Sequence, residues 1–350
     1  MTLPTTAEGL EAAARERVSS VAWAYYSAGS FAEKSVKDNV TSWSRWYLRN
    51  RVGVDVAHID LTTTVMGTSI ALPVLTAPCG FNKFAHPDGE FAVARACEAE
   101  GTIQVLSSAT ALPPAEVSAV SKGPKWLQLY ADVDKGVTDK RVAAAEDAGF
   151  LAVAITVDTP QLGIRYQGLA DVEAFLLELQ SIGVDSPILS FTQSLDWKEI
   201  ERIASNTKLP VILKGVLHPD DARIAPNHGV KGVIVSNHGG RQLDGSLPPA
   251  LALPDVAEAA GDNLEVYVDG GVRTGIDVLR ALALGARAVL IGRPYLWALA
   301  VDGEQGVRDL LRRFKTELHN AMALAGQTAV NRVDPSIVVP DSPRFLSSGR

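Results

Sequence analysis

One short segment combines residue types that can move a proton and bind an anion. It runs Ser236-Asn237-His238-Gly239-Gly240-Arg241-Gln242-Leu243-Asp244-Gly245. A histidine can act as a general base near neutral pH, and an arginine three residues later offers a fork of donors to a carboxylate. The glycines between them allow the backbone to approach a ligand closely. A lone histidine more often has a structural role than a catalytic one. The combination of His238, two glycines and Arg241 favours a base beside a carboxylate-binding group.

Polar residues and glycines also follow a series of short apolar runs. They are Cys79-Gly80, Ser107-Ser108, Gln128 with Tyr130, Thr156 with Asp158, Lys214, Ser236 with His238, Asp269-Gly270-Gly271 and Gly292-Arg293. A purely structural protein would have no reason to collect so many ionisable groups at the ends of its strands. The glycines of the last two groups, with Arg273 and Arg293, predict a phosphate-binding site, because glycine N–H groups and arginine side chains both bind phosphate.

Apolar runs rich in valine, isoleucine and leucine predict the strands that position these groups. They are Leu72–Ala77, Ile103–Leu106, Lys125–Leu129, Ala152–Thr156, Val211–Leu213, Gly232–Val235, Glu265–Val268 and Ala288–Ile291. Helical patterns such as Gly89–Gly101, Asp139–Gly149 and Gly275–Gly285 lie between them. The alternation fills residues 72–325, close to the length of about 250 residues that a barrel takes. We therefore predict an α/β fold, a single (β/α)8 TIM-barrel domain with its functional groups at the carboxyl ends of the strands.

The remaining residues are predicted to form an extension, a loop insertion and a tail. Residues 1–71 precede the barrel and contain a predicted helix at Ala7–Ala28. The longest gap between strand starts, from Ala152 to Val211, places an insertion in the fourth βα loop. Residues 326–350 form a tail that we expect to be loosely held after Asn331. A doubly wound open sheet is disfavoured, because its glycine-rich nucleotide loop is missing after the first strand.

The composition argues against several classes of protein. Of the 350 residues, 47% are hydrophobic and 21% charged, so the chain can bury a large core. A net charge of −7 without a Lys/Arg cluster argues against a nucleic-acid partner. No apolar run reaches about 18 residues, so we expect no membrane partner. Two cysteines, Cys79 and Cys97, and an N-terminus without an apolar signal core predict a cytoplasmic protein, and we predict no metal site.

Several motifs resemble those of the FMN-dependent 2-hydroxy acid oxidase and dehydrogenase family, which includes glycolate oxidase, lactate oxidase and mandelate dehydrogenase. The most specific match is the segment Ser236–Asp244. Further matches are Ala85-His86-Pro87-Asp88-Gly89-Glu90, Gln128-Leu129-Tyr130, Thr156-Val157-Asp158-Thr159-Pro160, Leu213-Lys214-Gly215-Val216, Asp269-Gly270-Gly271-Val272-Arg273 and Ile291-Gly292-Arg293-Pro294. The resemblance covers the chain from Tyr25-Tyr26 to Arg332. It implies a (β/α)8 barrel with FMN at its mouth, in agreement with the strand pattern.

The resemblance also implies roles for the matching residues. His238 would be the base that takes a proton from C2 or the hydroxyl of the substrate, and Asp158 would hold its imidazole. Lys214 would lie near the flavin N1–O2 edge. The substrate carboxylate would be bound by Arg165, Arg241, Tyr25 and Tyr130. Further contacts to the cofactor would come from Pro78, Cys79, Gly80, Ser107, Gln128, Thr156, Ser236, Asp269, Gly271, Arg273, Gly292 and Arg293.

Departures from the family pattern bear on the substrate and on the electron acceptor. Many members have Pro-Thr-Ala where this chain has Pro78-Cys79-Gly80, and the third position faces flavin N5 in the family. Ala109 stands where glycolate oxidase has a bulky aromatic residue, which favours a medium-sized or aromatic 2-hydroxy acid. The fourth loop is shorter than in glycolate oxidase and has no basic face for a membrane. By elimination, oxygen is the expected acceptor, giving hydrogen peroxide.

The resemblance leaves alternatives open. Within the family, the protein would be a 2-hydroxy acid dehydrogenase or a decarboxylating monooxygenase. Outside it, a non-redox FMN isomerase of a prenyl diphosphate would gain nothing from His238, Arg241 and Arg165. A flavin-binding protein without activity is disfavoured by His238 and Lys214. The family further implies a small-molecule (S)-2-hydroxy acid as partner and a homotetramer or homo-octamer.

Overall fold

The computed structural model describes residues 3–167, 172–184 and 192–341. In this part of the chain, parallel strands form a closed barrel in sequence order, with the last strand beside the first. The barrel strands are β4 (Val74–Thr76), β5 (Gln104–Ser107), β6 (Lys125–Leu129), β7 (Ala152–Thr156), β8 (Val211–Val216), β9 (Val230–Val235), β10 (Glu265–Val268) and β11 (Ala288–Ile291). Each overlaps the apolar run that predicted it. The predicted α/β (β/α)8 TIM barrel is confirmed.

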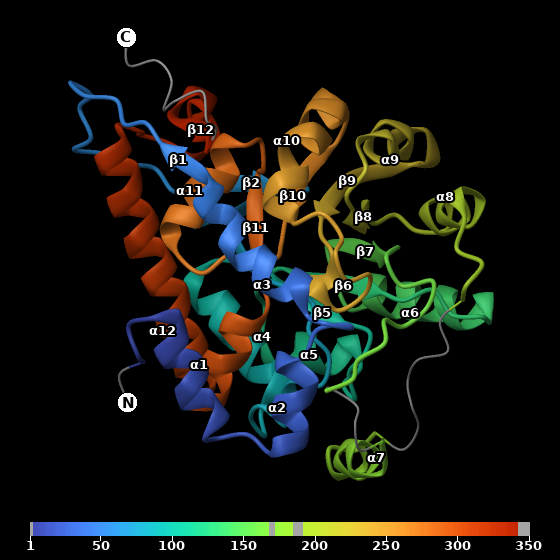
Figure 1. Ribbon diagram of the computed structural model, residues 1–350. Coiled ribbons are helices and arrows are strands. Elements are labelled where there is room, and N and C mark those ends of the chain that lie inside the picture. Colours follow the sequence, from blue (N-terminus) through green and yellow to red (C-terminus); the bar gives the residue numbers. More distant parts are fainter. Residues whose placement is uncertain (1–2, 168–171, 185–191, 342–350) are drawn as a thin grey trace.

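Helices alternate with these strands and surround the barrel (Figure 1). They are α4 (Gly89–Glu100), α5 (Pro114–Val120), α6 (Lys135–Asp147), α8 (Trp197–Ser205), α9 (Pro219–Ile224), α10 (Pro249–Ala260), α11 (Gly275–Ala283) and α12 (Arg293–Ala325). A further helix, α7 (Val172–Ser181), lies in the fourth βα loop, where the strand spacing predicts an insertion. No helix of the described residues is long and apolar enough to span a membrane.

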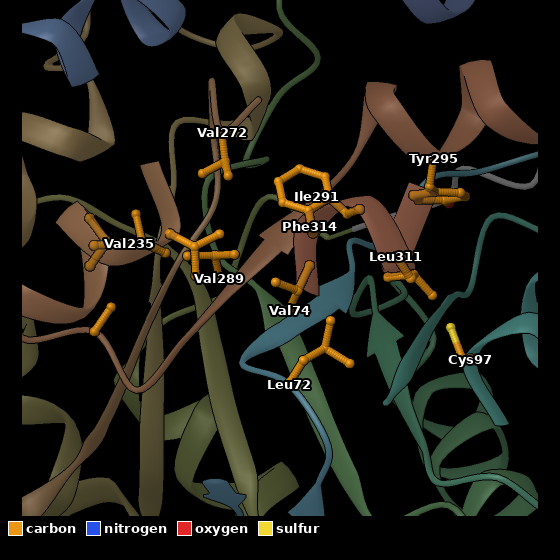
Figure 2. Packing of buried hydrophobic residues seen from close by; sticks show 14 of the residues in the cluster. Leu72, Val74, Cys97, Val235, Val272, Val289, Ile291, Tyr295, Leu311 and Phe314 are labelled. Carbon is orange, nitrogen blue, oxygen red and sulfur yellow. The ribbon is translucent and has the colours of Figure 1, made fainter. Parts of the chain in front are cut away.

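Alternate residues of the strands pack on opposite sides of the barrel wall, as the side-chain period of two requires. The side chains inside the barrel form one apolar cluster, which includes Leu75, Trp126, Ile234, Tyr267 and Leu290. Their neighbours on the outside join a larger cluster with the helices. Figure 2 shows part of that cluster, in which Val74, Val289 and Ile291 of the strands lie near Leu311 and Phe314 of α12.

A short hairpin closes the amino-terminal end of the barrel. Its strands are β2 (Thr63–Val65) and β3 (Thr68–Ile70), which pair antiparallel. Val65 and Ile70 belong to the apolar cluster inside the barrel, and Met66 packs against it. The backbone N–H of Met66 also donates to Glu265 at the start of β10 (3.0 Å). The sequence analysis did not predict this hairpin.

The N-terminal extension is helical, but the predicted single helix at Ala7–Ala28 is wrong. It is divided into α1 (Ala7–Arg15) and α2 (Ser20–Ser27). The break occurs because the Ser19 side chain accepts the N–H of Ala22 and so caps a new helix. A third helix, α3 (Lys34–Thr41), follows and lies against the loop after β9.

The C-terminal segment is not loosely held as far as residue 340. Strand β12 (Val338–Pro340) pairs antiparallel with β1 (Trp46–Leu48), which follows α3. Ile337, immediately before β12, is completely buried. The prediction of a loose tail is therefore wrong here, because an apolar anchor and a strand partner hold the segment. Residues 342–350 of the predicted tail lie outside the described residues.

Candidate active site

A pocket lies at the carboxyl ends of the barrel strands and is bounded by α2, α3 and α7. Most of the predicted site residues line it directly: Tyr25, Pro78, Cys79, Gly80, Ser107, Tyr130, Arg165, Lys214, His238, Arg241, Asp269, Gly271, Arg273, Gly292 and Arg293. The others, Gln128, Thr156, Asp158 and Ser236, are hydrogen-bonded to residues that line it or to one another. The structure therefore brings the predicted residues together around one cavity.

The side chains of His238 and Asp158 form a hydrogen-bonded pair in this pocket. His238 Nδ1 lies 2.9 Å from Asp158 Oδ1, and the side chains are 15% and 13% exposed. His238 Nε2 lies 3.4 Å from the hydroxyl of Tyr130. When Nδ1 carries the proton and donates it to Asp158, the lone pair of Nε2 faces the Tyr130 hydroxyl and can accept a proton. The pair therefore presents a proton acceptor to the pocket.

Burial and charge keep His238 unprotonated. Burial and the nearby Lys214 outweigh the opposing charge of Asp158, and together they lower the pKa of His238 to about 4. For Asp158, burial raises the pKa, but His238 and Lys214 outweigh it and the net direction is downward. A neutral imidazole beside an ionised carboxylate is the state that a general base needs.

Two guanidinium groups stand beside this pair. Burial, together with the smaller effect of the nearby Arg241, lowers the pKa of Arg165 to about 10. Arg165 Nε has no hydrogen-bond partner among the described residues. Arg241 lies over the ring of Tyr25 at 5.0 Å and donates to the carbonyl of Tyr25 at 2.6 Å. An anion between these two cations would relieve their repulsion, so the arrangement suits a carboxylate.

A row of buried polar side chains crosses the ends of adjacent strands. Gln128 accepts from Ser107 (2.8 Å) and donates to Thr156 (2.8 Å). Lys214 donates to Ser236 (3.3 Å) and lies 3.7 Å from Asp269 Oδ2. Asp269 Oδ1 is buried without a hydrogen-bond partner, and burial raises the pKa of this carboxyl. Buried polar atoms normally have partners, so the orphaned oxygen points to a missing ligand with a donor.

The loops after β10 and β11 contain the glycines and arginines predicted to bind phosphate. Gly270 and Gly271 both have positive φ, 88° and 81°. Burial, together with the smaller effects of Arg241 and Arg273, lowers the pKa of Arg293 to about 9. The Arg293 guanidinium donates to carbonyls at the end of α2, including Tyr26 (3.0 Å), and to the carbonyl of Gly239 (2.9 Å). Phosphate binding by Arg273 and Arg293 stays a prediction.

Two polar residues that the sequence analysis did not assign support the site. Gln242 Nε2 donates to the carbonyls of Asp158 (3.0 Å) and Gln161 (2.9 Å), and its Oε1 accepts from Gly163 (3.2 Å). It thus joins the loop of His238 to the loop of Asp158. Asn39 of α3 also lines the pocket. Residue type alone could not find Asn39, because an isolated asparagine in a polar helix has no distinguishing pattern.

The fold and the pocket together define a class, a (β/α)8-barrel enzyme with a base and an anion-binding site at its carboxyl-terminal face. The family model described as FMN-dependent dehydrogenase matches residues 14–340, and the chain belongs to this family. Glycolate oxidase 1 of Oryza sativa subsp. indica is 40% identical, with 96% of this chain and 95% of that protein covered. Glycolate oxidase of Spinacia oleracea is 39% identical, with 96% of each covered.

Solved structures of mandelate oxidase share the fold. A variant with 4-Br-2-hydroxy-methylphenylacetate superimposes with a TM-score of 0.88 at 37% identity, covering 95% of this chain and 99% of that one. A structure with (S)-2-phenylpropionate has a TM-score of 0.85 at 36% identity, covering 96% and 98%. These similarities extend over nearly the whole chain and are not confined to the motifs.

FMN is the cofactor of this family, and the residues present fit it. The polar row of Ser107, Gln128 and Thr156 supplies both donors and acceptors for a heterocyclic edge. Lys214 supplies a positive charge beside that row. Asp269 Oδ1, which has no hydrogen-bond partner among the described residues, could accept a hydrogen bond from a hydroxyl group of the cofactor. The positive charges of Arg273 and Arg293 repel each other, and a phosphate would provide the anion that relieves this repulsion. We assign these residues to FMN binding as a proposal.

Proposed function

We propose that this protein oxidises a 2-hydroxy acid to the 2-oxo acid, with FMN as cofactor and oxygen as final acceptor. The His238–Asp158 pair beside Arg165 and Arg241 is the observation that carries the proposal. The substrate loses the hydrogens on C2 and on its hydroxyl, and oxygen gains two electrons and two protons to become hydrogen peroxide. FMN, when bound, supplies the electron acceptor for the substrate.

The protein's own residues fix the substrate and move its proton. Arg165 and Arg241 bind the carboxylate and so orient the C2 carbon. His238 Nε2 takes a proton from the substrate, and Asp158 stabilises the imidazolium that results. Burial raises the pKa of Tyr130, so its phenol stays protonated and can donate a hydrogen bond to the substrate.

The apolar part of the pocket supports a medium-sized or aromatic substrate side chain. Ala109, Leu162, Phe175 and Leu179 line it. Phe175 of α7 stacks on Tyr25 with ring centroids 5.3 Å apart. A small alanine among large apolar side chains leaves space that a phenyl or branched alkyl group would fill. The aromatic ligands named for the mandelate oxidase structures point the same way.

Oxygen as the acceptor is supported by the oxidase names of the relatives. We further propose a homotetramer or homo-octamer in the cytoplasm, which rests on the family resemblance and on the sparse cysteines. Sedimentation of the FMN-loaded protein would measure the assembly.

The central test is anaerobic mixing of the FMN-loaded protein with 2-hydroxy acids, without NADPH. We expect the yellow absorbance to bleach, and to return in air with one hydrogen peroxide for each 2-oxo acid. His238→Gln should retain FMN and lose bleaching by about 10²- to 10⁴-fold, the usual contribution of a general base. Bleaching of the variant at the wild-type rate would remove His238 from its role.

The same experiment separates the alternatives. Slow return of colour in air would identify a dehydrogenase, and release of carbon dioxide would identify a decarboxylating monooxygenase. If no 2-hydroxy acid bleaches the wild-type protein, the oxidase proposal is wrong, and the isomerase and binding-protein alternatives return.

A further inference from the structure

The segment with His238 has an unusual backbone that something must hold in place. His238, Gly239 and Gly240 all have positive φ, 58°, 64° and 77°. The left-handed region is easy for glycine but unfavourable for a histidine. Such a conformation persists only where the surroundings determine it. The contacts around this segment therefore decide whether His238 faces Asp158.

The preceding residue, Asn237, makes the contacts that bind the segment to the N-terminal extension. Asn39 Nδ2 donates to Asn237 Oδ1, and Asn237 Nδ2 donates to Asn39 Oδ1, both at 2.7 Å. Asn237 Oδ1 also accepts the N–H of Gly240 at 3.1 Å. Both asparagines are buried, 2% and 4% exposed. A reciprocal amide pair of this kind fixes both side chains, and through Gly240 it fixes the turn around His238.

Helix α3, which contains Asn39, is itself fixed to both ends of the same loop. Asp244 accepts the N–H groups of Ala32 (3.1 Å) and Ser35 (2.8 Å). The start of α3 also packs closely against Gly240 of this loop. A Cβ added to Gly240 would lie 2.6 Å from the backbone nitrogen of Val36. Figure 1 shows α3 beside the strands of the barrel. The extension is thus a rigid support for the loop.

We propose that Asn39 is a positioning residue, which acts through Asn237 to hold His238 in its left-handed conformation toward Asp158 and the pocket. The catalytic meaning of this contact rests on the proposed function. The support of the loop by Asn39 does not depend on the proposed function, because it follows from the hydrogen bonds alone.

The test compares Asn39→Ala, Asn237→Ala and the double variant, all loaded with FMN. The control is Asn320→Ala, which removes an exposed asparagine from α12. The first measurement is hydrogen exchange of the peptide covering residues 236–243. We expect exchange at least about tenfold faster in Asn39→Ala and unchanged in the control. The amide of Gly240 donates to both the side-chain and the backbone oxygen of Asn237, and the variant leaves the side chain of Asn237 without its fixed partner.

The second measurement is the rate of anaerobic FMN bleaching at saturating 2-hydroxy acid. We expect a fall of about tenfold or more in each single variant, and no further fall in the double variant, because the pair acts as a unit. Substrate affinity should fall less than the bleaching rate, because Arg165 lies on another loop and keeps its contact with the carboxylate even where Arg241 is loosened. FMN content should stay at the wild-type level, which a general structural defect would lower. If Asn39→Ala does not fold, Asn39→Ser replaces it with the same expected directions, because the shorter hydroxyl side chain cannot form the reciprocal amide pair with Asn237.

Each outcome is decisive for a separate claim. Unchanged exchange in Asn39→Ala overturns the proposal, and so does faster exchange with a wild-type bleaching rate. Additive losses in the double variant also overturn it. Faster exchange in a protein that no 2-hydroxy acid bleaches, wild type included, refutes the proposed function and leaves the support of the loop by Asn39 standing.

Discussion

The imidazole of His238 has an environment that sets its protonation state before any substrate arrives. Burial is the largest influence on its pKa, and Lys214 acts in the same direction. Asp158 opposes both without reversing them. Active sites commonly shift the pKa of a catalytic base in this way, so that the base has the protonation state its reaction needs.

The low pKa of His238 predicts the pH dependence of FMN reduction. Because the free base is the active form and its pKa is about 4, we expect the bleaching rate to stay constant between roughly pH 8 and pH 5. An ordinary histidine, with a pKa of about 6.5, would lose half of the rate at about pH 6.5 and nearly all of it at pH 5. Stopped-flow bleaching across this range, with a 2-hydroxy acid that is fully ionised throughout, measures the profile. An acid limb centred near pH 6.5 would contradict the prediction.

The side chain of residue 109 predicts substrate selectivity. Ala109 lines the pocket beside Gly80, where an added Cβ would lie 3.1 Å from the Ala109 methyl. We expect Ala109→Trp to lower the bleaching efficiency with aromatic 2-hydroxy acids by about tenfold or more, because the indole would fill the space for their rings. Glycolate serves as the internal control, since it has no side chain to clash. Equal losses with glycolate and aromatic acids would argue against this assignment.

At the scale of elements, an irregularity in β8 positions Asp158. The pairing of β8 with β9 shifts register between Lys214 and Val216. Gly215, the residue between them, has φ 113°, and a Cβ there would lie 2.5 Å from the Cβ of Asp158. A bulge next to an active site commonly directs a side chain. Here it also leaves room for the carboxylate that holds His238.

Substitution of Gly215 tests this arrangement. We expect Gly215→Ala to lower the bleaching rate by at least about tenfold, because the methyl group would displace Asp158 from His238. Gly149→Ala is the matched control, because Gly149 also has positive φ (78°) but nothing lies within 4 Å of an added Cβ. The control should cost about 1 kcal/mol of stability and keep its activity. Equal activity losses in both variants would point to backbone strain as the cause.

The elements that the sequence predicts well are those with a continuous apolar pattern. The barrel strands are buried on both faces, so their position is visible from composition alone. The hairpin of β2 and β3 escaped prediction because each strand has only three residues. The boundary between α1 and α2 depends on one capping hydrogen bond of Ser19, which an apolar pattern does not reveal.

The same contrast holds for the site. Residues of motifs such as Ser236–Arg241 were found by type and spacing, and the structure brings them to one pocket. Asn39 and Phe175 were not assigned, because they reach the pocket from segments far away in the sequence. Only tertiary structure shows that Asn39 meets Asn237, 198 residues later.

At the scale of the whole molecule, the two ends of the described chain stabilise each other. The pairing of β1 with β12 joins the N-terminal extension to the C-terminal segment, and Ile337 is buried beside it. We expect Ile337→Ala to lower the free energy of unfolding by about 2–5 kcal/mol, as for other buried aliphatic truncations. Denaturant unfolding of the FMN-loaded protein measures this change.

A truncation on the surface provides the comparison. Leu324 of α12 is 70% exposed, so Leu324→Ala should change stability by no more than about 0.5 kcal/mol. If Ile337→Ala is as harmless as Leu324→Ala, the C-terminal segment does not contribute to stability in solution.

The hairpin of β2 and β3 affects where small molecules can enter and leave the barrel. With Val65, Ile70 and Met66 packed against the inner cluster, the floor of the barrel is sealed by apolar side chains within the described residues. Under the proposed function, the 2-hydroxy acid and the 2-oxo acid would therefore enter and leave at the opposite end, where the described pocket lies. Because both acids would occupy this one pocket, we expect added 2-oxo acid to compete with the 2-hydroxy acid for binding.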